Sequence, residues 1–462
     1  MAMSLRRNVV VVATALVMVM GGLSARAGHN DDQHSKNFKQ LALEKIVIDE
    51  DAYAQGSDLA FKDDLVIAGT YQGPAIFKIL RSKPFIKQIG FLPCAGGQGD
   101  VSVMGDYLVI SVDSPLTGPT CSAEDTAGAA AGPTTAGEAW EGIRIIDISN
   151  PARPRYVSSV DIPCGSHTNT LLPGKSKTYV YIESYPLSGQ GVDCNYGTHR
   201  KVQIVEIPND DPKKAKLLDD TIDVSPNIGC HDITTFPERK LMFGACVTQS
   251  FVWSIKDPTK PERLATITNP EIQIHHSTAM TWDGKILILG DETGGAAAGG
   301  GPGDEEAPVG AAWFYDVSDP ENPTHLGHHS YPRQPPSGPG EADRARWTNH
   351  NFNVIPMRDP KKYLLAVSYY SGGIAVVDFS DPTDPTELGN YINYEDGVAP
   401  DTWSSYWYNG RIYTNDYLSE HGVGVYEFAG TTSPATTRFF GSGPLNRQGE
   451  VNPQVQIWSF RK

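Results

Sequence analysis

Short runs of alternating apolar and polar residues recur along this chain and predict β-strands almost throughout. A period of two residues is typical of a strand with one buried face. The runs come in pairs, joined by turns that contain Asp-Pro, Asn-Pro or Gly, where a helix cannot continue. We therefore predict an all-β protein that is built from hairpins.

One hairpin pattern is repeated along the chain: an apolar strand, an Asp/Ser-Pro turn and a second strand. Clear copies, followed by two looser ones, occupy residues 142–160, 251–267, 311–329, 373–391, 201–220 and 74–92. Another hairpin precedes each copy, as at residues 58–69, 100–111, 276–290 and 402–415. Two hairpins make one four-stranded propeller blade, with strands A to D running from the axis to the rim.

The innermost strands mark the number of blades. They begin near Asp58, Asp100, His167, His231, His276, His350 and Thr402. These starts predict a seven-bladed β-propeller over residues 57–429. The seventh unit lacks its D strand, and residues 39–48 alternate without a partner. We expect this N-terminal segment, within residues 28–56, to complete blade 7, because an open ring would expose strand edges.

The repeat core reads IRIIDIS, AVVDFS and, in degenerate form, WFYDVS. It resembles the LVIVD-repeat family of secreted bacterial β-propeller proteins, and the similarity covers most of residues 57–429. The resemblance implies the fold. It implies no catalytic residues, since that family has no single agreed activity and a fold does not define a function.

The N-terminus has the features of a signal peptide over residues 1–27. Arg6 and Arg7 precede an apolar run at residues 9–20, and Ala25-Arg26-Ala27 forms an A-x-A cleavage site. The run is short for a membrane span. We expect a secreted or extracytoplasmic protein, at the cell surface or in the periplasm, with no membrane span after cleavage. A retained N-terminal anchor is the alternative.

Charge and composition narrow the choice of partners. The net charge of −16, without a basic cluster, argues against nucleic acid as a partner. Long connections at residues 113–141, 185–200, 292–310 and 331–347 all fall on one propeller face. Function concentrates in such loops, so we expect a small-molecule or protein ligand there. The C-terminal tail, residues 430–462, ends in an aromatic segment, 457–460, that we expect to dock on the rim.

Four of the A strands begin with a histidine. The residues are His167, His231, His276 and His350, in a chain with only 12 histidines. Neutral imidazoles that converge on one point are transition-metal ligands. We predict a metal site at the channel mouth, with Fe or Cu favoured and Zn possible, because structural zinc prefers cysteine-rich sites. A metal-free structural ring, inherited through the repeats, is the alternative.

Further polar residues accompany the histidines. Asp58, Asp100 and Thr402, with Asp401, are expected to line the rest of the channel. Metal-bound histidines usually donate their second N–H to an acceptor such as a carboxylate. From hairpin geometry, the candidate acceptors are Glu183, Asp291 and Glu292.

Six cysteines in an exported chain suggest disulfides. The blade arrangement selects three pairings, each within one blade and on the histidine face: Cys94–Cys121, Cys164–Cys194 and Cys230–Cys246. Each would stabilise the fold by about 3 kcal/mol. Cysteine ligands to the metal are the weaker alternative.

Two functions follow from these features. The first is a metal-dependent enzyme, with redox chemistry favoured. The second is a non-catalytic extracellular binding or scaffold propeller without metal. The chain contains no G-x-S-x-G motif of the kind that carries a hydrolase nucleophile.

Overall fold

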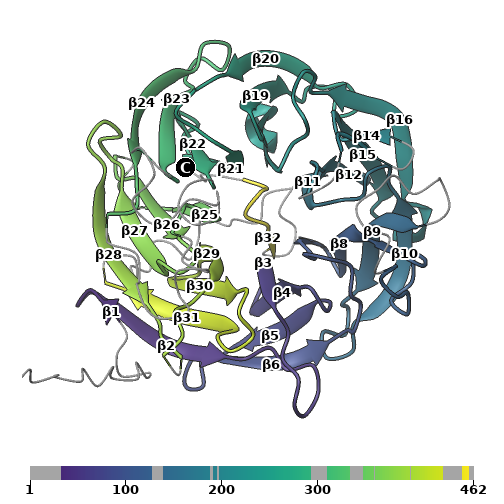
Figure 1. Cartoon of the computed structure of the whole chain (residues 1–462), viewed down its shortest axis with the longest axis horizontal. Coiled ribbons are helices and arrows are strands. Elements are labelled where there is room, and N and C mark those ends of the chain that lie inside the picture. Colours follow the sequence, from purple (N-terminus) through teal and green to yellow (C-terminus); the bar gives the residue numbers. More distant parts are fainter. Residues whose placement is uncertain are drawn as a thin grey trace, which may run out of the picture.

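The computed structural model describes residues 33–126, 139–187, 191–194, 197–292, 308, 310–332, 347–357, 359, 361–395, 397–429 and 450–456. Its strands form seven four-stranded antiparallel blades in a ring, as predicted (Figure 1). The expected signal peptide and parts of all four long connections lie outside the described residues. Among those described, no helix is long and apolar enough to cross a membrane.

Each blade runs from an inner A strand to an outer D strand. Blade 1 consists of β3 (Gly56–Lys62), β4 (Leu65–Thr70), β5 (Ala75–Ile79) and β6 (Ile86–Phe91). Blade 2 consists of β7 (Val101–Met104), β8 (Tyr107–Leu116), β9 (Trp140–Asp147) and β10 (Arg155–Asp161). Blade 3 consists of β11 (Thr168–Pro173), β12 (Lys177–Glu183), β15 (Lys201–Pro208) and β16 (Lys216–Asp223). Blade 4 consists of β17 (Asp232–Phe236), β18 (Leu241–Cys246), β19 (Gln249–Ser254) and β20 (Glu262–Ile267).

The remaining blades follow the same order. Blade 5 consists of β21 (His275–Met280), β22 (Ile286–Asp291), β23 (Ala312–Asp316) and β24 (Thr324–His329). Blade 6 consists of β25 (Phe352–Ile355), β26 (Leu364–Ser368), β27 (Ile374–Asp378) and β28 (Thr386–Ile392), with β1 (Gln33–His34) on its outer edge. Blade 7 consists of β29 (Thr402–Tyr408), β30 (Arg411–Asp416), β31 (Val423–Phe428) and β2 (Phe38–Glu44). The minor elements are β13 (Asp193–Cys194), β14 (Gly197–Thr198), β32 (Glu450–Val451) and the 3-10 turns η2 (Pro212–Lys214) and η3 (Pro237–Arg239).

The N-terminal strand closes the ring, as the sequence predicted. β2 pairs antiparallel with β31, with Phe38 opposite Phe428 and Glu44 opposite Val423. In Figure 1 the first and last long strands of the chain lie side by side. Phe38 is buried against Phe428, so the closure is apolar as well as hydrogen-bonded.

The core lies between neighbouring blades. Phe61 of blade 1 stacks on Tyr408 of blade 7, with ring centroids 4.6 Å apart. Phe314 of blade 5 stacks on Phe379 of blade 6 at 4.9 Å. Because both faces of a blade are covered by its neighbours, inner strands such as β3, β4 and β22 are buried along their whole length.

A C-terminal segment, residues 450–456, lies inside the ring rather than on the rim. Val451 of β32 pairs with Phe61 of β3, and Val455 forms a parallel bridge with Thr235. Figure 1 shows β32 at the centre of the disc. The aromatic end of the tail, residues 457–460, lies outside the described residues.

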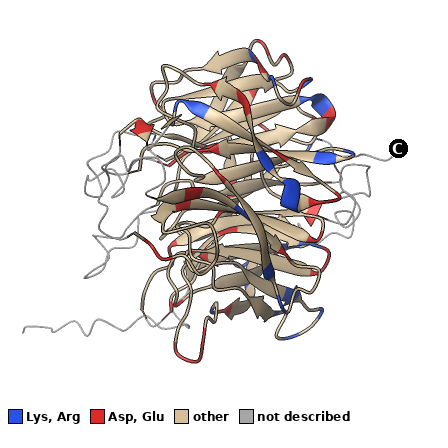
Figure 2. Cartoon of the chain, turned by 90° about the vertical axis from the view of Figure 1, so that its right-hand side faces the viewer, with Lys and Arg blue, Asp and Glu red and all other residues tan. Residues whose placement is uncertain are grey.

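The three predicted disulfides are confirmed. Cys94 pairs with Cys121, Cys164 with Cys194 and Cys230 with Cys246. A buried arginine, Arg144, supports the first of these loops by donating hydrogen bonds to the backbone carbonyls of Ala95, Pro119 and Thr120. Seen edge-on, the disc carries interspersed acidic and basic residues (Figure 2).

Candidate metal centre

Strand pairing places the histidines at the same height in successive blades. The amide of His167 donates to the carbonyl of Glu183, that of His231 to Ala245, and that of His350 to Ser368. In each case the acceptor is at or near the end of the B strand. The hairpin geometry is therefore repeated from blade to blade, and it holds each histidine at the start of its A strand.

A repeated hydrogen bond between blades defines the equivalent positions in the rest of the ring. The residue after the histidine position donates its hydroxyl to the carbonyl of the histidine position in the next blade. The pairs are Thr168 to His231 at 2.5 Å, Ser277 to His350 at 2.9 Å and Ser404 to Ser57 at 3.0 Å. Ser57 and Trp403 are therefore the counterparts of the histidines in blades 1 and 7.

Asp58 and Thr402 were predicted to occupy the histidine position in blades 1 and 7, and the structure places each of them one residue away from it. Asp58 follows the histidine position by one residue, as Asp232 does in blade 4, and both line a central cavity together with Asp100. Thr402 precedes that position. Its hydroxyl and the amide of Asp401 donate to Asp416 at the end of β30, and Trp403 lines the cavity instead.

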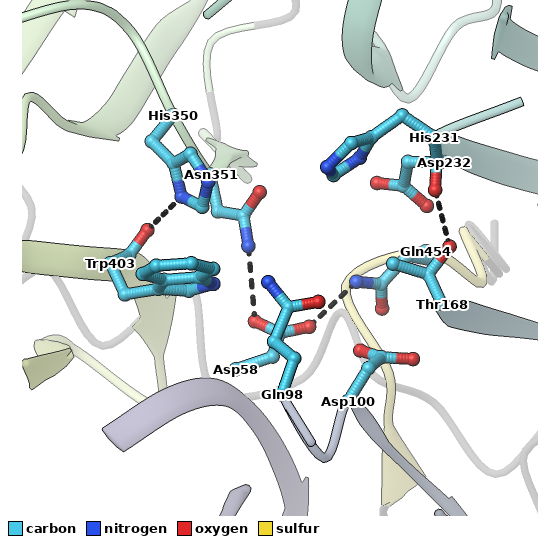
Figure 3. A pocket seen from close by; sticks show the side chains of 10 residues that line it. All are labelled: Asp58, Gln98, Asp100, Thr168, His231, Asp232, His350, Asn351, Trp403 and Gln454. Carbon is cyan, nitrogen blue, oxygen red and sulfur yellow. Dashed lines mark hydrogen bonds between the residues drawn. The ribbon is translucent and has the colours of Figure 1, made fainter. Parts of the chain in front are cut away.

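The structure brings all four predicted histidine rings into one arc. The ring centroids of His167 and His231 lie 4.6 Å apart, those of His231 and His276 3.7 Å, and those of His276 and His350 4.3 Å. All four side chains are buried. Figure 3 shows His231 and His350 facing each other across the cavity.

Hydrogen bonds orient the two ends of the arc. His167 donates its Nδ1 proton to Asp113 of β8 at 2.8 Å, and its Nε2 lies 3.1 Å from Nε2 of His231. His350 donates its Nδ1 proton to the carbonyl of Trp403 at 2.5 Å. Both end rings therefore present an Nε2 lone pair toward the interior of the arc.

Glu292, directly after β22, places its carboxylate beside His276 and His350, at the blade 6 end of the arc. One oxygen lies 3.6 Å from Nε2 of His276, and the other lies 3.8 Å from Nε2 of His350. Tyr370 donates its hydroxyl to the second oxygen at 2.6 Å. One possible ligand atom from each of His231, His276 and Glu292 lies within 4.8 Å of the others.

The two other predicted acceptors have different partners. The carboxylate of Glu183 accepts a hydrogen bond from Thr168 at 3.0 Å. Asp291 accepts from the backbone amides of Gln273 and Ile274. Asp113, which sequence reasoning did not name, is the carboxylate that contacts His167.

The protein environment keeps the central imidazoles neutral. Burial lowers the pKa of His231 well below its usual value, and the neighbouring His276 and His167 lower it further. Burial lowers the pKa of His276 to about 4, although Glu292 opposes this shift. Among the described residues, neither ring nitrogen of His276 has a hydrogen-bond partner. A neutral, unpartnered imidazole has its lone pair available to a metal.

A second set of residues surrounds the histidines, and sequence reasoning named only Glu292 among them. Asp113, Tyr185, Glu292 and Tyr370 each lie two residues beyond the B-strand residue that pairs with the residue after the histidine position. The ring of Tyr185 contacts His167 and His231, and that of Tyr370 contacts His350. The signal was present in the sequence, because these acidic and tyrosine residues recur at one place in the repeat.

A second group of possible ligands contains cysteines. Cys164, Cys194 and His199 lie close together, but the two cysteines form a disulfide. Their sulfurs are therefore not thiolate ligands in this structure.

A comparison with known protein families agrees with the repeat. The LVIVD repeat family model matches residues 137–162 and 367–393, which include the C and D strands of blades 2 and 6. A search of curated proteins gives no match. Similar solved structures include a functionally unknown protein from Desulfotomaculum acetoxidans DSM 771, with a TM-score of 0.45 and 11% identity over 70% of this chain and 83% of that one. The chain is therefore a seven-bladed β-propeller in which two stretches match the LVIVD repeat.

Proposed function

We propose that this propeller binds a transition-metal ion between His231, His276 and Glu292. The observation that carries the proposal is the close approach of three possible ligand atoms in a buried arc of neutral imidazoles. His350 and His167 flank this group and supply further imidazole nitrogens. Without an ion, the bare ring nitrogens of His276 would leave buried polar atoms unsatisfied, which costs free energy.

The ligand set favours iron(II) over copper and zinc. Two histidines and one carboxylate, with open positions, are typical of non-haem iron(II) oxygenases. The side chain of Glu292 is 20% exposed, so the group is open toward the face of the long connections. A bound iron would supply one-electron and oxygen chemistry. We therefore propose a redox enzyme that acts on a small molecule reaching this face.

The disulfides bear on where the protein acts. All six cysteines are paired, which is typical of proteins from oxidising compartments. Together with the signal-like N-terminus, this supports secretion to an extracytoplasmic compartment.

Metal content tests the proposal directly. We expect protein purified without a histidine tag to contain about one iron per chain, since one ion satisfies one ligand set of this kind. The variant with His231→Ala and His276→Ala should contain none. Its matched control carries His325→Ala and His328→Ala, on the outer strand β24. Metal that is absent from the wild type, or equal in both variants, would instead favour a scaffold propeller without metal.

Asp113 is expected to act as a positioning residue for the arc. Asp113→Ala should weaken metal affinity by at most about 10-fold to 100-fold, the range typical of direct partners of ligating histidines, because Asp113 contacts the flanking His167. The effect would pass through His167, which contacts His231. Asp113→Asn keeps an oxygen for the hydrogen bond and should recover most of the affinity. Calorimetric titration with metal measures the affinity of both variants. Equal affinities for Asp113→Ala and wild type would exclude this role.

A further inference from the structure

A second polar cluster lies in the channel below the histidine arc. It surrounds a cavity of about 10 Å³, roughly the space that one ion or one water molecule needs. Figure 3 shows the side chains of Asp58, Asp100, Gln98 and Gln454 on the side of the cavity opposite His231 and His350. No function considered so far uses these groups.

Three carboxylates line this cavity. Asp58, Asp100 and Asp232 are each at most 5% exposed and come from the A strands of blades 1, 2 and 4 or the residues directly before them. Burial and the nearby charges of Asp58 and Asp232 raise the pKa of Asp100 well above its usual value. Crowded buried carboxylates of this kind favour a bound proton or a cation that offsets their charge. The residues that line the cavity include no lysine or arginine to compensate the charge.

Oxygen atoms of the same cluster are left without hydrogen bonds. Among the described residues, Oδ1 of Asp232, Oε1 of Gln98 and Oε1 of Gln454 have no partner, and all three side chains line the cavity. Each residue is about 5% exposed. The two glutamine oxygens are an observation separate from the acidic cluster, because these neutral groups also lack a hydrogen-bond donor. Such buried acceptors are costly unless a cation or a donor occupies the cavity.

We propose that this cluster is a calcium site, formed by Asp58, Asp100 and Asp232 with the amide oxygens of Gln98 and Gln454. Calcium takes six to eight oxygen ligands from carboxylates, amide carbonyls and water, in flexible geometry. The all-oxygen set separates this site from the nitrogen-rich arc above it. The proposal does not rest on the transition metal.

The site would join the C-terminal segment to the ring. Gln454 donates its amide to Asp58 at 2.7 Å, and Asn452 exchanges two hydrogen bonds with the backbone of Val103. The amide of Met280 donates to Gln456 at 2.7 Å. The segment therefore already bonds to blades 1, 2 and 5. Calcium would add a link between Gln454 and carboxylates of blades 1, 2 and 4, and so would stabilise the closed ring.

The test uses the full chain after removal of metals with EDTA. Adding calcium chloride should raise the midpoint of thermal unfolding, and calorimetry should give one calcium per chain. Asp100→Asn should lower calcium affinity at least tenfold, on the order expected when one charged ligand is lost. Asparagine keeps an oxygen for the two hydrogen bonds that Asn169 donates. The calcium-free variant should therefore unfold at or above the temperature of the calcium-free wild type, since a buried charge is gone.

Two controls separate the outcomes. Asp106→Asn, in the exposed turn after β7, should leave calcium binding unchanged. The variant His276→Ala, whose side chain does not line the cavity, should keep the calcium effect even if it loses iron, so the two sites are tested independently. A wild type that does not respond to calcium would overturn the proposal and assign a shared proton to Asp58 and Asp100. An equal calcium response of Asp100→Asn and wild type would overturn it as well.

Discussion

A mature chain without residues 33–48 is expected to aggregate instead of forming a stable ring. The deletion removes β2, whose pairing with β31 runs from Phe38 to Glu44, and leaves the edge of blade 7 open. It also exposes the surface that buried Phe38 and Ile46 cover. Burial of side chains of this size contributes about 1.5–3 kcal/mol each. The loss, with the hydrogen bonds of one strand, is comparable to the total stability of about 5–15 kcal/mol of a typical domain.

Size-exclusion chromatography and thermal unfolding measure this effect. Phe38→Ala is the milder variant and should cost about 3–5 kcal/mol, as truncation of a buried phenylalanine does. Lys39→Ala is the matched control, because Lys39 is exposed on the same strand. A monomeric deletion variant with the unfolding temperature of the full chain would show that β2 does not close the ring in solution.

Replacing Glu292 is expected to cause the largest loss of metal affinity by a single substitution. Its two carboxylate oxygens face His276 and His350, and it is the carboxylate of the proposed ligand set. Glu292→Gln keeps the size of the side chain and an oxygen for the hydrogen bond from Tyr370. We expect affinity for iron(II) to fall on the order of 100-fold, or about 2.8 kcal/mol.

The fold should be unaffected by this change, because Glu292 lies after the end of β22 and outside the core. Competition with a chromogenic chelator measures the affinity, and thermal unfolding without metal measures the fold. Glu124→Gln, on an exposed loop, is the matched control. If Glu292→Gln binds iron as tightly as wild type, the ligands are the four histidines and the carboxylate has another role.

The number of blades, the closing strand and the disulfides could be predicted because each depends on local pattern and order. A strand period of two, turns at Asp-Pro and hairpins in succession leave few arrangements. The pairings of Cys94, Cys164 and Cys230 followed once each cysteine was assigned to a blade and a face. The meeting of the four histidines followed from the same repeat logic.

The register within the hairpins could not be read from the sequence to one residue. β-Bulges shift the pairing in blades 1, 5 and 7, so Asp58 and Thr402 were assigned to the histidine position that Ser57 and Trp403 occupy. The sequence also could not predict which side chain points toward which histidine. Glu183 was expected beside His167, but Asp113 of the preceding blade reaches that ring.

The sequence by itself determined the ring, its closure and the height at which the histidines lie, because hydrogen-bonded hairpins repeat the same geometry in each blade. Only the tertiary structure decided which carboxylates face those imidazoles and that Gln454 enters the channel. These contacts join residues from different blades or from the distant C-terminus, and their formation depends on packing around the axis rather than on any local pattern.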